Sequence, residues 1–313
     1  MNIQQLEYIE AVSELRSFDK AAEKCCITQS TLSTMVSRLE KELGIVFFDR
    51  KTKPITVTRE GQELINQAQT ILREINNFKE LVSGLKGELR GSLKIGAIPT
   101  VASYLFPLFL KEFIEAHPKI HFTISEGVTE KIISDLESRK LDIGLLSTPL
   151  DHPNLIEVPL YQEPFILFDS ARRKVTEQTD DVDLNKIDVN RLWLLEEGHC
   201  LRAQISKLCS LRKERSPDWN LEYKSGTIDT LKRFVKLNDG LTIFPQLATI
   251  DFSMEDRRHL RKFKKPVPAR EVSLVVHKHF VKKKILNELK NVITDTVSPL
   301  ISKEKKVQLV SPV

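Results

Sequence analysis

From Glu60 to about Leu85 the chain contains no proline, and apolar residues recur with the spacing of one face of an α-helix. The apolar positions are Leu64, Ile65, Ala68, Ile71, Leu72, Ile75, Phe78, Leu81 and Val82. This periodicity over so long a helix favours a partner helix and therefore dimerisation; the alternative is a helix that packs only on its own domain. Gly84, Gly87 and Gly91 mark the end of the helix and a hinge. The helix therefore separates two parts of the chain that have different patterns.

The part before this helix has the pattern of a helix-turn-helix. A first helix is predicted from apolar residues at helical spacing, which are Ile3, Leu6, Ile9 and Val12. A second helix is expected over Phe18 to Cys25, with Ser17 as N-cap and with the small residues Ala21 and Ala22 allowing close helix approach. A third begins after the N-cap Thr28 and ends at Gly44, and its apolar face carries Leu32, Val36, Leu39 and Leu43. Two helices joined by a turn of about three residues are typical of DNA-binding domains.

The third helix presents polar side chains away from its apolar face. These are Gln29, Ser30, Ser33, Thr34, Ser37 and Arg38. Glutamine and arginine can contact base edges through two hydrogen bonds, and serine and threonine can bind bases or phosphates. Residues 46 to 58 are predicted to form a hairpin wing, from which Arg50, Lys51 and Lys53 would hold the flanking phosphates. The alternative is a solvated helix beside a charged turn.

Composition and charge indicate an ordinary soluble protein rather than a membrane or secreted one. Hydrophobic residues make up 41% of the chain and charged residues 29%. The formal net charge is +5, but residues 1 to 90 hold 13 Lys+Arg and 13 Asp+Glu, so DNA attraction must come from local clusters. The apolar run from Tyr104 to Leu110 is too short to span a bilayer, and the N-terminus lacks the pattern of a signal peptide. We therefore expect a cytoplasmic protein with no membrane partner.

After Gly91 short strand and helix patterns alternate, which predicts an α/β domain with largely parallel sheets and room for two lobes around a cleft. The expected strands are Ser92 to Ile98, Ile120 to Ser125, Ile143 to Leu146, Phe165 to Phe168, Leu192 to Leu195, Leu241 to Phe244 and Val272 to Val276. The expected helices are Leu105 to Ala116, Glu130 to Ser138, Leu201 to Leu211, Ile228 to Leu237 and Lys283 to Val297. We expect four regions: a DNA-binding domain (1–60), a linker helix and hinge (61–90), a regulatory domain (91–302) and a flexible tail (303–313).

Two cysteines in this second part, Cys200 and Cys209, indicate redox chemistry. His199 precedes Cys200 and Arg202 follows it, and neighbouring cations lower a thiol pKa and favour the thiolate. A thiolate attacks peroxide to give a sulfenic acid, which a second thiol converts to a disulfide. The leaving hydroxide needs a donor, for which we consider His199, Thr100 and Arg202. The alternative is a pair of buried structural thiols.

The spacing of the two cysteines adds a mechanical expectation. If residues 201 to 209 are helical, the two Cα atoms lie roughly 13 Å apart. A disulfide needs about 4.4 to 6.8 Å. Bond formation would therefore require local unwinding of the helix, and this rearrangement is the expected signal.

Residues 1 to 61 resemble the N-terminal domain of LysR-type transcriptional regulators. The matching residues are Ser17 to Ala22, Thr28 to Ser33, Leu39-Glu40, Leu43-Gly44, Phe48, Arg50 and Thr58 to Gly61. The resemblance implies a winged helix-turn-helix, a linker helix that dimerises and a two-lobed domain similar to periplasmic binding proteins. It also implies homo-oligomers, a dimer of dimers, that bind promoter DNA with dyad symmetry, and RNA polymerase is an expected further partner. In this sequence Cys25 and Cys26 depart from the family pattern of a large aliphatic residue, and we expect them to pack against neighbouring helices.

The second part resembles the hydrogen peroxide-sensing members of that family. The resemblance depends on Ile98 to Val101, Lys140 to Asp142, Glu157 to Leu160 and Glu197 to Arg202. It implies that Cys200 is the peroxidatic cysteine, that Cys209 is the resolving one, and that Thr100, Thr129 and His199 line the peroxide pocket, to which we add Arg202. Peroxide would then be the signal of a transcriptional activator.

Other features are weaker, and two other functions stay open. His277 and His279 lack a third zinc ligand, and the basic stretch from Arg257 to Lys265 is expected to be a solvated face, with a second nucleic-acid surface as the alternative. No nucleotide or metalloprotease motif is present, so no cofactor is expected. A regulator that binds a metabolite in its cleft would gain thermal stability from that ligand. A thiol peroxidase would turn over peroxide continuously with a reductant, but the helix-turn-helix argues against an enzyme.

Overall fold

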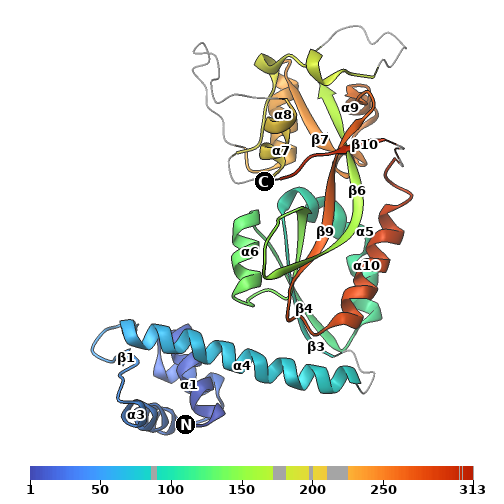
Figure 1. Ribbon diagram of the computed structural model, residues 1–313. Coiled ribbons are helices and arrows are strands. Elements are labelled where there is room, and N and C mark those ends of the chain that lie inside the picture. The colour runs from blue at the N-terminus through green and yellow to red at the C-terminus, as the bar shows by residue number, and fades with distance from the viewer. Residues whose placement is uncertain are drawn as a thin grey trace. The chain divides into compact units, whose positions relative to one another are not determined.

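The computed structural model describes residues 1–85, 90–171, 181–196, 200–209, 225–302, 304 and 306–312. The chain forms two compact units, Met1–Gly87 and Glu88–Val313, which we call the N-terminal and C-terminal units (Figure 1). Within the described residues, no helix is both long and apolar enough to cross a bilayer.

The N-terminal unit is a helix-turn-helix with a short hairpin. Its elements are α1 (Ile3–Leu15), α2 (Phe18–Lys24), α3 (Gln29–Leu43), β1 (Phe48–Asp49), β2 (Thr56–Val57) and α4 (Arg59–Leu85). The predicted caps are confirmed, since Ser17 accepts from the Lys20 amide and Thr28 from the Thr31 amide. Gly44 ends α3 with φ 69°, a left-handed conformation that favours glycine. The winged helix-turn-helix is therefore present as predicted.

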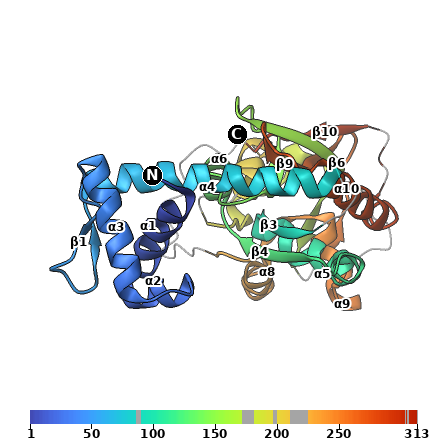
Figure 2. The same cartoon turned by 90° about the horizontal axis from the view of Figure 1, so that it is seen from below.

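Helix α4 is one continuous helix of 27 residues, about 40 Å long at 1.5 Å per residue (Figures 1 and 2). Its first half packs against the unit's own core through three buried residues, Ile65, Ala68 and Leu72. A neighbouring face leaves large apolar side chains in solvent: Ile71 is 37% exposed, Phe78 69% and Val82 39%. The helix thus has one apolar face that is covered within the unit and a second that is not.

The C-terminal unit is built on a mixed sheet with the strand order β4-β3-β5-β9-β6-β7. Its strands are β3 (Gly91–Ala97), β4 (Ile120–Glu126), β5 (Ile143–Thr148), β6 (Leu155–Asp169), β7 (Leu241–Pro245), β8 (Leu260–Arg261), β9 (Val267–His277) and β10 (Val307–Leu309). Its α-helices are α5 (Pro99–Ala116), α6 (Thr129–Glu137), α7 (Cys200–Leu208), α8 (Ile228–Leu237), α9 (Met254–Arg257) and α10 (Lys283–Val297). The described part of the unit also contains short 3₁₀ helices at Leu184–Lys186, Val189–Arg191 and Gln246–Thr249.

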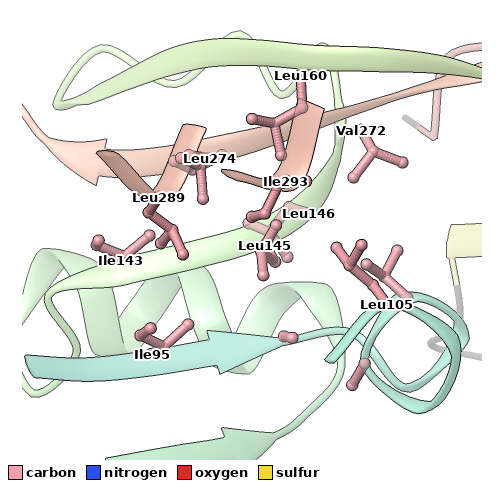
Figure 3. Close-up of a cluster of buried hydrophobic side chains, with 14 of the residues drawn as sticks. Ile95, Leu105, Ile143, Leu145, Leu146, Leu160, Val272, Leu274, Leu289 and Ile293 are labelled. Atoms are coloured by element: carbon pink, nitrogen blue, oxygen red, sulfur yellow. The ribbon is translucent and has the colours of Figure 1, made fainter. Parts of the chain in front are cut away.

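Two long antiparallel strands, β6 and β9, extend along the C-terminal unit from one hydrophobic core to the other (Figure 1). One hydrophobic core, which we call core I, contains side chains from β3, β5, β9, α5 and α10; Figure 3 shows part of it, including Ile95, Leu145 and Leu289. A second core, core II, contains Phe165 and Phe168 at the end of β6 together with residues of α7 and α8. The two cores correspond to the two lobes expected from the sequence.

Several details differ from the expectations. Parallel pairing holds for β3 with β4 and β5 and for β9 with β10, but β9 pairs antiparallel with β5 and β6, and β6 with β7, so the sheet is mixed rather than largely parallel. Leu192 and Leu195 form only isolated bridges, because the adjoining residues do not continue the ladder. The tail expected to be flexible contains β10, which pairs with β9 and buries Val310 in core II. This apolar contact is what fixes that part of the tail.

Candidate functional site

The topology brings Thr100 and Thr129 to one edge of the sheet. Strands β3 and β4 are parallel neighbours, and each is followed directly by a helix, α5 and α6. The carboxyl ends of parallel strands share an edge, so the first turns of both helices meet there. Thr100 is the second residue of α5 and Thr129 the first of α6, and both are buried.

Cys200 is the first residue of α7 and faces Thr129. Its side chain is buried in core I, whereas the following Leu201 and Ile205 belong to core II. Hydrogen bonds from the Thr129 hydroxyl and from the Leu201 backbone N–H act on the sulfur, and both lower the Cys200 pKa. The Thr129 Oγ1 has no nitrogen or oxygen partner among the described residues. Cys200 thus lies between the lobes, at a helix N-terminus that favours negative charge.

Arg270 on β9 supplies the positive charge of the site. It is 1% exposed and donates from Nη1 to Thr100 Oγ1 (3.0 Å) and from Nη2 to the Thr100 carbonyl (2.9 Å). Its Nε donates to Glu163 Oε2 at 2.9 Å, and the other carboxylate oxygen of Glu163 accepts from the Leu247 amide at 2.8 Å. The guanidinium therefore joins α5, β6 and β9 beside the thiol, and its charge lowers the Cys200 pKa.

The net effect on Cys200 corrects our expectation of a depressed pKa. Burial is the largest influence and raises the Cys200 pKa above its ordinary value, whereas Arg270, Thr129 and the Leu201 amide lower it and Glu130 raises it. A buried thiolate loses its hydration, and this loss outweighs the nearby positive charge. The resting site therefore holds a neutral thiol beside groups arranged to stabilise the thiolate.

Cys209 follows directly on the last residue of α7. Its amide donates to the Ile205 carbonyl at 2.9 Å, so the helical hydrogen bonding continues to this residue. Both cysteines are free thiols, and burial raises the pKa of Cys209 to about 11. Nine helical steps place the two Cα atoms about 13 Å apart, well beyond the reach of a disulfide. In this form of the protein the helix therefore holds the thiols apart.

The structure describes only one of the two other expected pocket residues. His199 lies outside the described residues. Arg202 is described, and its Nη1 donates to the Leu195 carbonyl at 2.8 Å. The cation beside Cys200 is instead Arg270, which the sequence reasoning missed because it lies far along the chain on another strand. Its signal was a lone arginine inside an apolar strand, Val267–His277, since arginine is almost never fully buried unless paired.

The expected DNA-binding residues share the surface of α3 and the hairpin. Those that are exposed are Gln29, Ser30, Thr34, Arg38, Arg50, Lys51 and Lys53. Ser33 and Ser37 are half-buried and accept hydrogen bonds from Arg50, both at 2.9 Å. Arg50 also pairs with Glu40 at 3.0 Å and lies over the Phe18 ring. The hairpin arginine is therefore fastened to α3, which leaves the other polar residues facing solvent.

The remaining candidates play no part in these two sites. Cys25 packs against the helical core as expected, but Cys26 is exposed in the turn before α3, which corrects that half of the expectation. The rings of His277 and His279 lie 5.3 Å apart. Within the described ranges, no three His, Cys, Asp or Glu side chains are grouped so that they could hold a metal ion.

Comparison with known proteins adds a family to this geometry. Residues 3–62 match the family described as bacterial regulatory helix-turn-helix protein, lysR family. Residues 86–297 match the family described as LysR substrate binding domain. The chain is 34% identical over 280 residues to the DNA-binding transcriptional dual regulator OxyR of Escherichia coli, covering 88% of this chain and 89% of the relative.

Two solved structures resemble the whole chain. The full-length OxyR of Pseudomonas aeruginosa, a cysteine-to-aspartate variant, has 29% identity and a TM-score of 0.73, covering 94% of this chain and 98% of that one. A Corynebacterium glutamicum OxyR mutant with bound H2O2 has 25% identity and a TM-score of 0.62, covering 98% of each chain.

Proposed function

Because the chain belongs to the LysR family of bacterial transcriptional regulators, we propose that it is a peroxide-responsive activator switched by Cys200 and Cys209. The observation that carries this proposal is the position of the Cys200 thiol, buried at the start of α7 beside Thr129 and Arg270. A purely structural thiol has no need of a buried guanidinium or of a hydroxyl that hydrogen-bonds to its sulfur. The resemblance to a structure that holds H2O2 supports the same ligand here.

The first chemical step is attack of the Cys200 thiolate on one peroxide oxygen. The S–O bond forms, the O–O bond breaks, and the leaving hydroxide takes up a proton to become water. The sulfur is oxidised by two electrons to a sulfenic acid. Arg270 stabilises the thiolate, and the Thr129 hydroxyl, which lacks a nitrogen or oxygen partner among the described residues, can donate to the peroxide. Burial keeps the thiol neutral until peroxide arrives, which limits reaction with other electrophiles.

The second step joins the two cysteines. The Cys209 sulfur attacks the sulfenic sulfur of Cys200, the S–O bond breaks, and water leaves. Because helix α7 holds the two residues about 13 Å apart, this step needs the helix to unwind. The disulfide then stabilises a second arrangement of the C-terminal unit. This rearrangement, rather than the sulfur chemistry itself, is the signal.

The N-terminal unit would deliver the signal to promoter DNA. LysR-type regulators bind DNA through their helix-turn-helix and oligomerise, and here α3 presents Gln29, Ser30, Thr34 and Arg38 to solvent for the bases. Lys51 and Lys53 extend this surface toward phosphates. The uncovered apolar face of α4, with Phe78 at its centre, supports pairing with a second copy. Contact with RNA polymerase is an expectation carried by the activator function.

The test compares transcripts of cells that carry the unaltered chain, Cys200→Ser or Cys26→Ser, before and after peroxide addition. We expect Cys200→Ser to abolish the peroxide response while DNA binding is kept. Cys26→Ser, which changes an exposed thiol in the other unit, is the matched control and should respond normally. A full response in Cys200→Ser would refute the proposal.

Two measurements separate the other functions. A metabolite regulator would show a rise in melting temperature with a small molecule and no need of Cys200. A thiol peroxidase would consume many equivalents of peroxide per chain in the presence of a thiol reductant. We expect neither, because one disulfide per chain completes the proposed reaction.

A further inference from the structure

Gln204 lies one helical turn after Cys200 and is fully buried, with 0% of its surface exposed. Glutamine is mostly found on protein surfaces, so a buried one is held by specific partners. Its Nε2 donates to the Ser147 Oγ at 3.1 Å and to the Val310 carbonyl at 2.6 Å. These partners belong to β5 and to the end of the chain, so Gln204 joins α7 to two segments that are remote in sequence.

The end of the chain is itself held against the sheet. Strand β10 pairs in parallel with β9, with Val307 opposite Val267 and Leu309 opposite Ala269. The Val310 amide donates to the Ala269 carbonyl at 2.9 Å, directly before Arg270. The Val310 side chain is buried in core II, to which Leu201 and Ile205 of α7 also belong.

From this arrangement we propose that Gln204 is a positioning residue that clamps α7 to Ser147 and to the C-terminal strand in the dithiol form. The inference rests on the proposed function, because its consequence is control of disulfide formation. Gln204 lies between the two cysteines in sequence, so unwinding of α7 that reaches this residue breaks both of its bonds. Disulfide formation therefore releases Val310, and release of Val310 favours the disulfide, since coupling between two sites is reciprocal.

The hydrogen bonding of the amide also favours a clamp that can open. Ser147 passes the connection on by donating to the Glu271 carbonyl at 3.1 Å, which ties α7 to β9 through β5. The other end of the amide, Gln204 Oε1, is buried and has no hydrogen-bond partner among the described residues. A buried acceptor without a partner opposes the closed state, and unwinding returns it to water. The two hydrogen bonds of Nε2 thus stabilise the helical form of α7, and the unpaired Oε1 destabilises it.

The first experiment needs no peroxide. Hydrogen–deuterium exchange is measured on the reduced full-length chain, its Gln204→Leu variant and the matched control Ser206→Ala on the same helix. We expect the amides of residues 306 to 311 to exchange at least about fivefold faster in Gln204→Leu and at the original rate in Ser206→Ala. Unchanged protection of this segment in Gln204→Leu would overturn the proposal.

The second experiment measures the disulfide equilibrium in glutathione buffers. Two electrons and two protons pass from Cys200 and Cys209 to oxidised glutathione, which yields two glutathione thiols. We expect the ratio of disulfide to dithiol at a fixed glutathione ratio to rise about tenfold in Gln204→Leu. A chain that ends at Leu309 lacks Val310 but keeps the sequence of α7 unchanged, and it should show the same rise. An unchanged ratio in both variants refutes the clamp, whereas loss of only the peroxide reaction, with these shifts retained, refutes the proposed function instead.

Discussion

Replacing Ala203 by glycine should accelerate disulfide formation by making α7 easier to unwind. Ala203 lies in the middle of this nine-residue helix, half-buried and outside both hydrophobic cores. Glycine in place of alanine costs a helix interior about 1 kcal/mol. If unwinding is a rapid equilibrium before the sulfur–sulfur bond forms, its constant rises about fivefold for about 1 kcal/mol. The rate of disulfide formation should rise by the same factor.

The assay mixes reduced full-length protein with one equivalent of peroxide, quenches it in acid at successive times and measures the loss of two hydrogens by mass spectrometry. Cys209→Ser isolates the first step, whose rate Ala203→Gly should leave unchanged in that background. The matched control is Asn287→Gly, an exposed position on α10, which should not alter disulfide formation. Equal rates of disulfide formation for Ala203→Gly and the unaltered chain would refute unwinding as the gate.

Three further predictions concern other parts of the protein. Arg270→Gln should raise the Cys200 pKa further, because the Arg270 charge lowers it. The thiolate fraction then falls, so alkylation of Cys200 near neutral pH should slow about tenfold for every tenfold loss of thiolate. The double variant Arg270→Gln with Glu163→Gln leaves no unpaired buried charge and should also slow the alkylation of Cys200. Burial raises the Cys209 pKa from 9.0 to about 11, so its neutral thiol stabilises the fold below about pH 9 and this contribution is lost as the pH rises to about 11. Urea unfolding of Cys209→Ala should therefore show a smaller loss of stability in that window, and an equal loss would contradict the assignment. Phe78→Glu should weaken dimerisation at least about tenfold in analytical ultracentrifugation, because burying a phenylalanine contributes about 1.5 to 3 kcal/mol, whereas Asn76→Glu on the same helix should not.

Local sequence patterns predicted the helices of the N-terminal unit well, because their caps and periodicity are encoded within a few residues. Ser17, Thr28 and Gly44 take the capping positions that were expected of them. The full length of strand β6 was harder to predict from the sequence. Val158 and Pro159 in its first half carry no local strand pattern and are extended because β9 pairs with them. The C-terminal strand depends in the same way on a partner distant in sequence.

For the site, the sequence indicated the reacting groups but not their electrostatics. The likeness to a known family pointed to Thr100, Thr129 and the two cysteines. The neighbours of Cys200 in sequence suggested a lowered pKa, yet the charge that acts on it comes from Arg270, and burial outweighs that charge. Residues that lie close only after folding, such as Arg270, Glu163 and Gln204, leave no short-range pattern to read.

The two strands shared by both lobes also bear on how information can travel through the C-terminal unit. Strands β6 and β9 pair from Leu155 to Pro164, and the pairing is interrupted only by the bulge near Leu160. The two lobes are therefore joined by a hydrogen-bonded pair of strands rather than by two separate flexible segments. Rotation of one lobe against the other would have to bend or twist these two hydrogen-bonded strands. A stimulus that acts through one short helix avoids that cost. The architecture of the unit therefore suits a signal that begins as a change in covalent bonding at one helix.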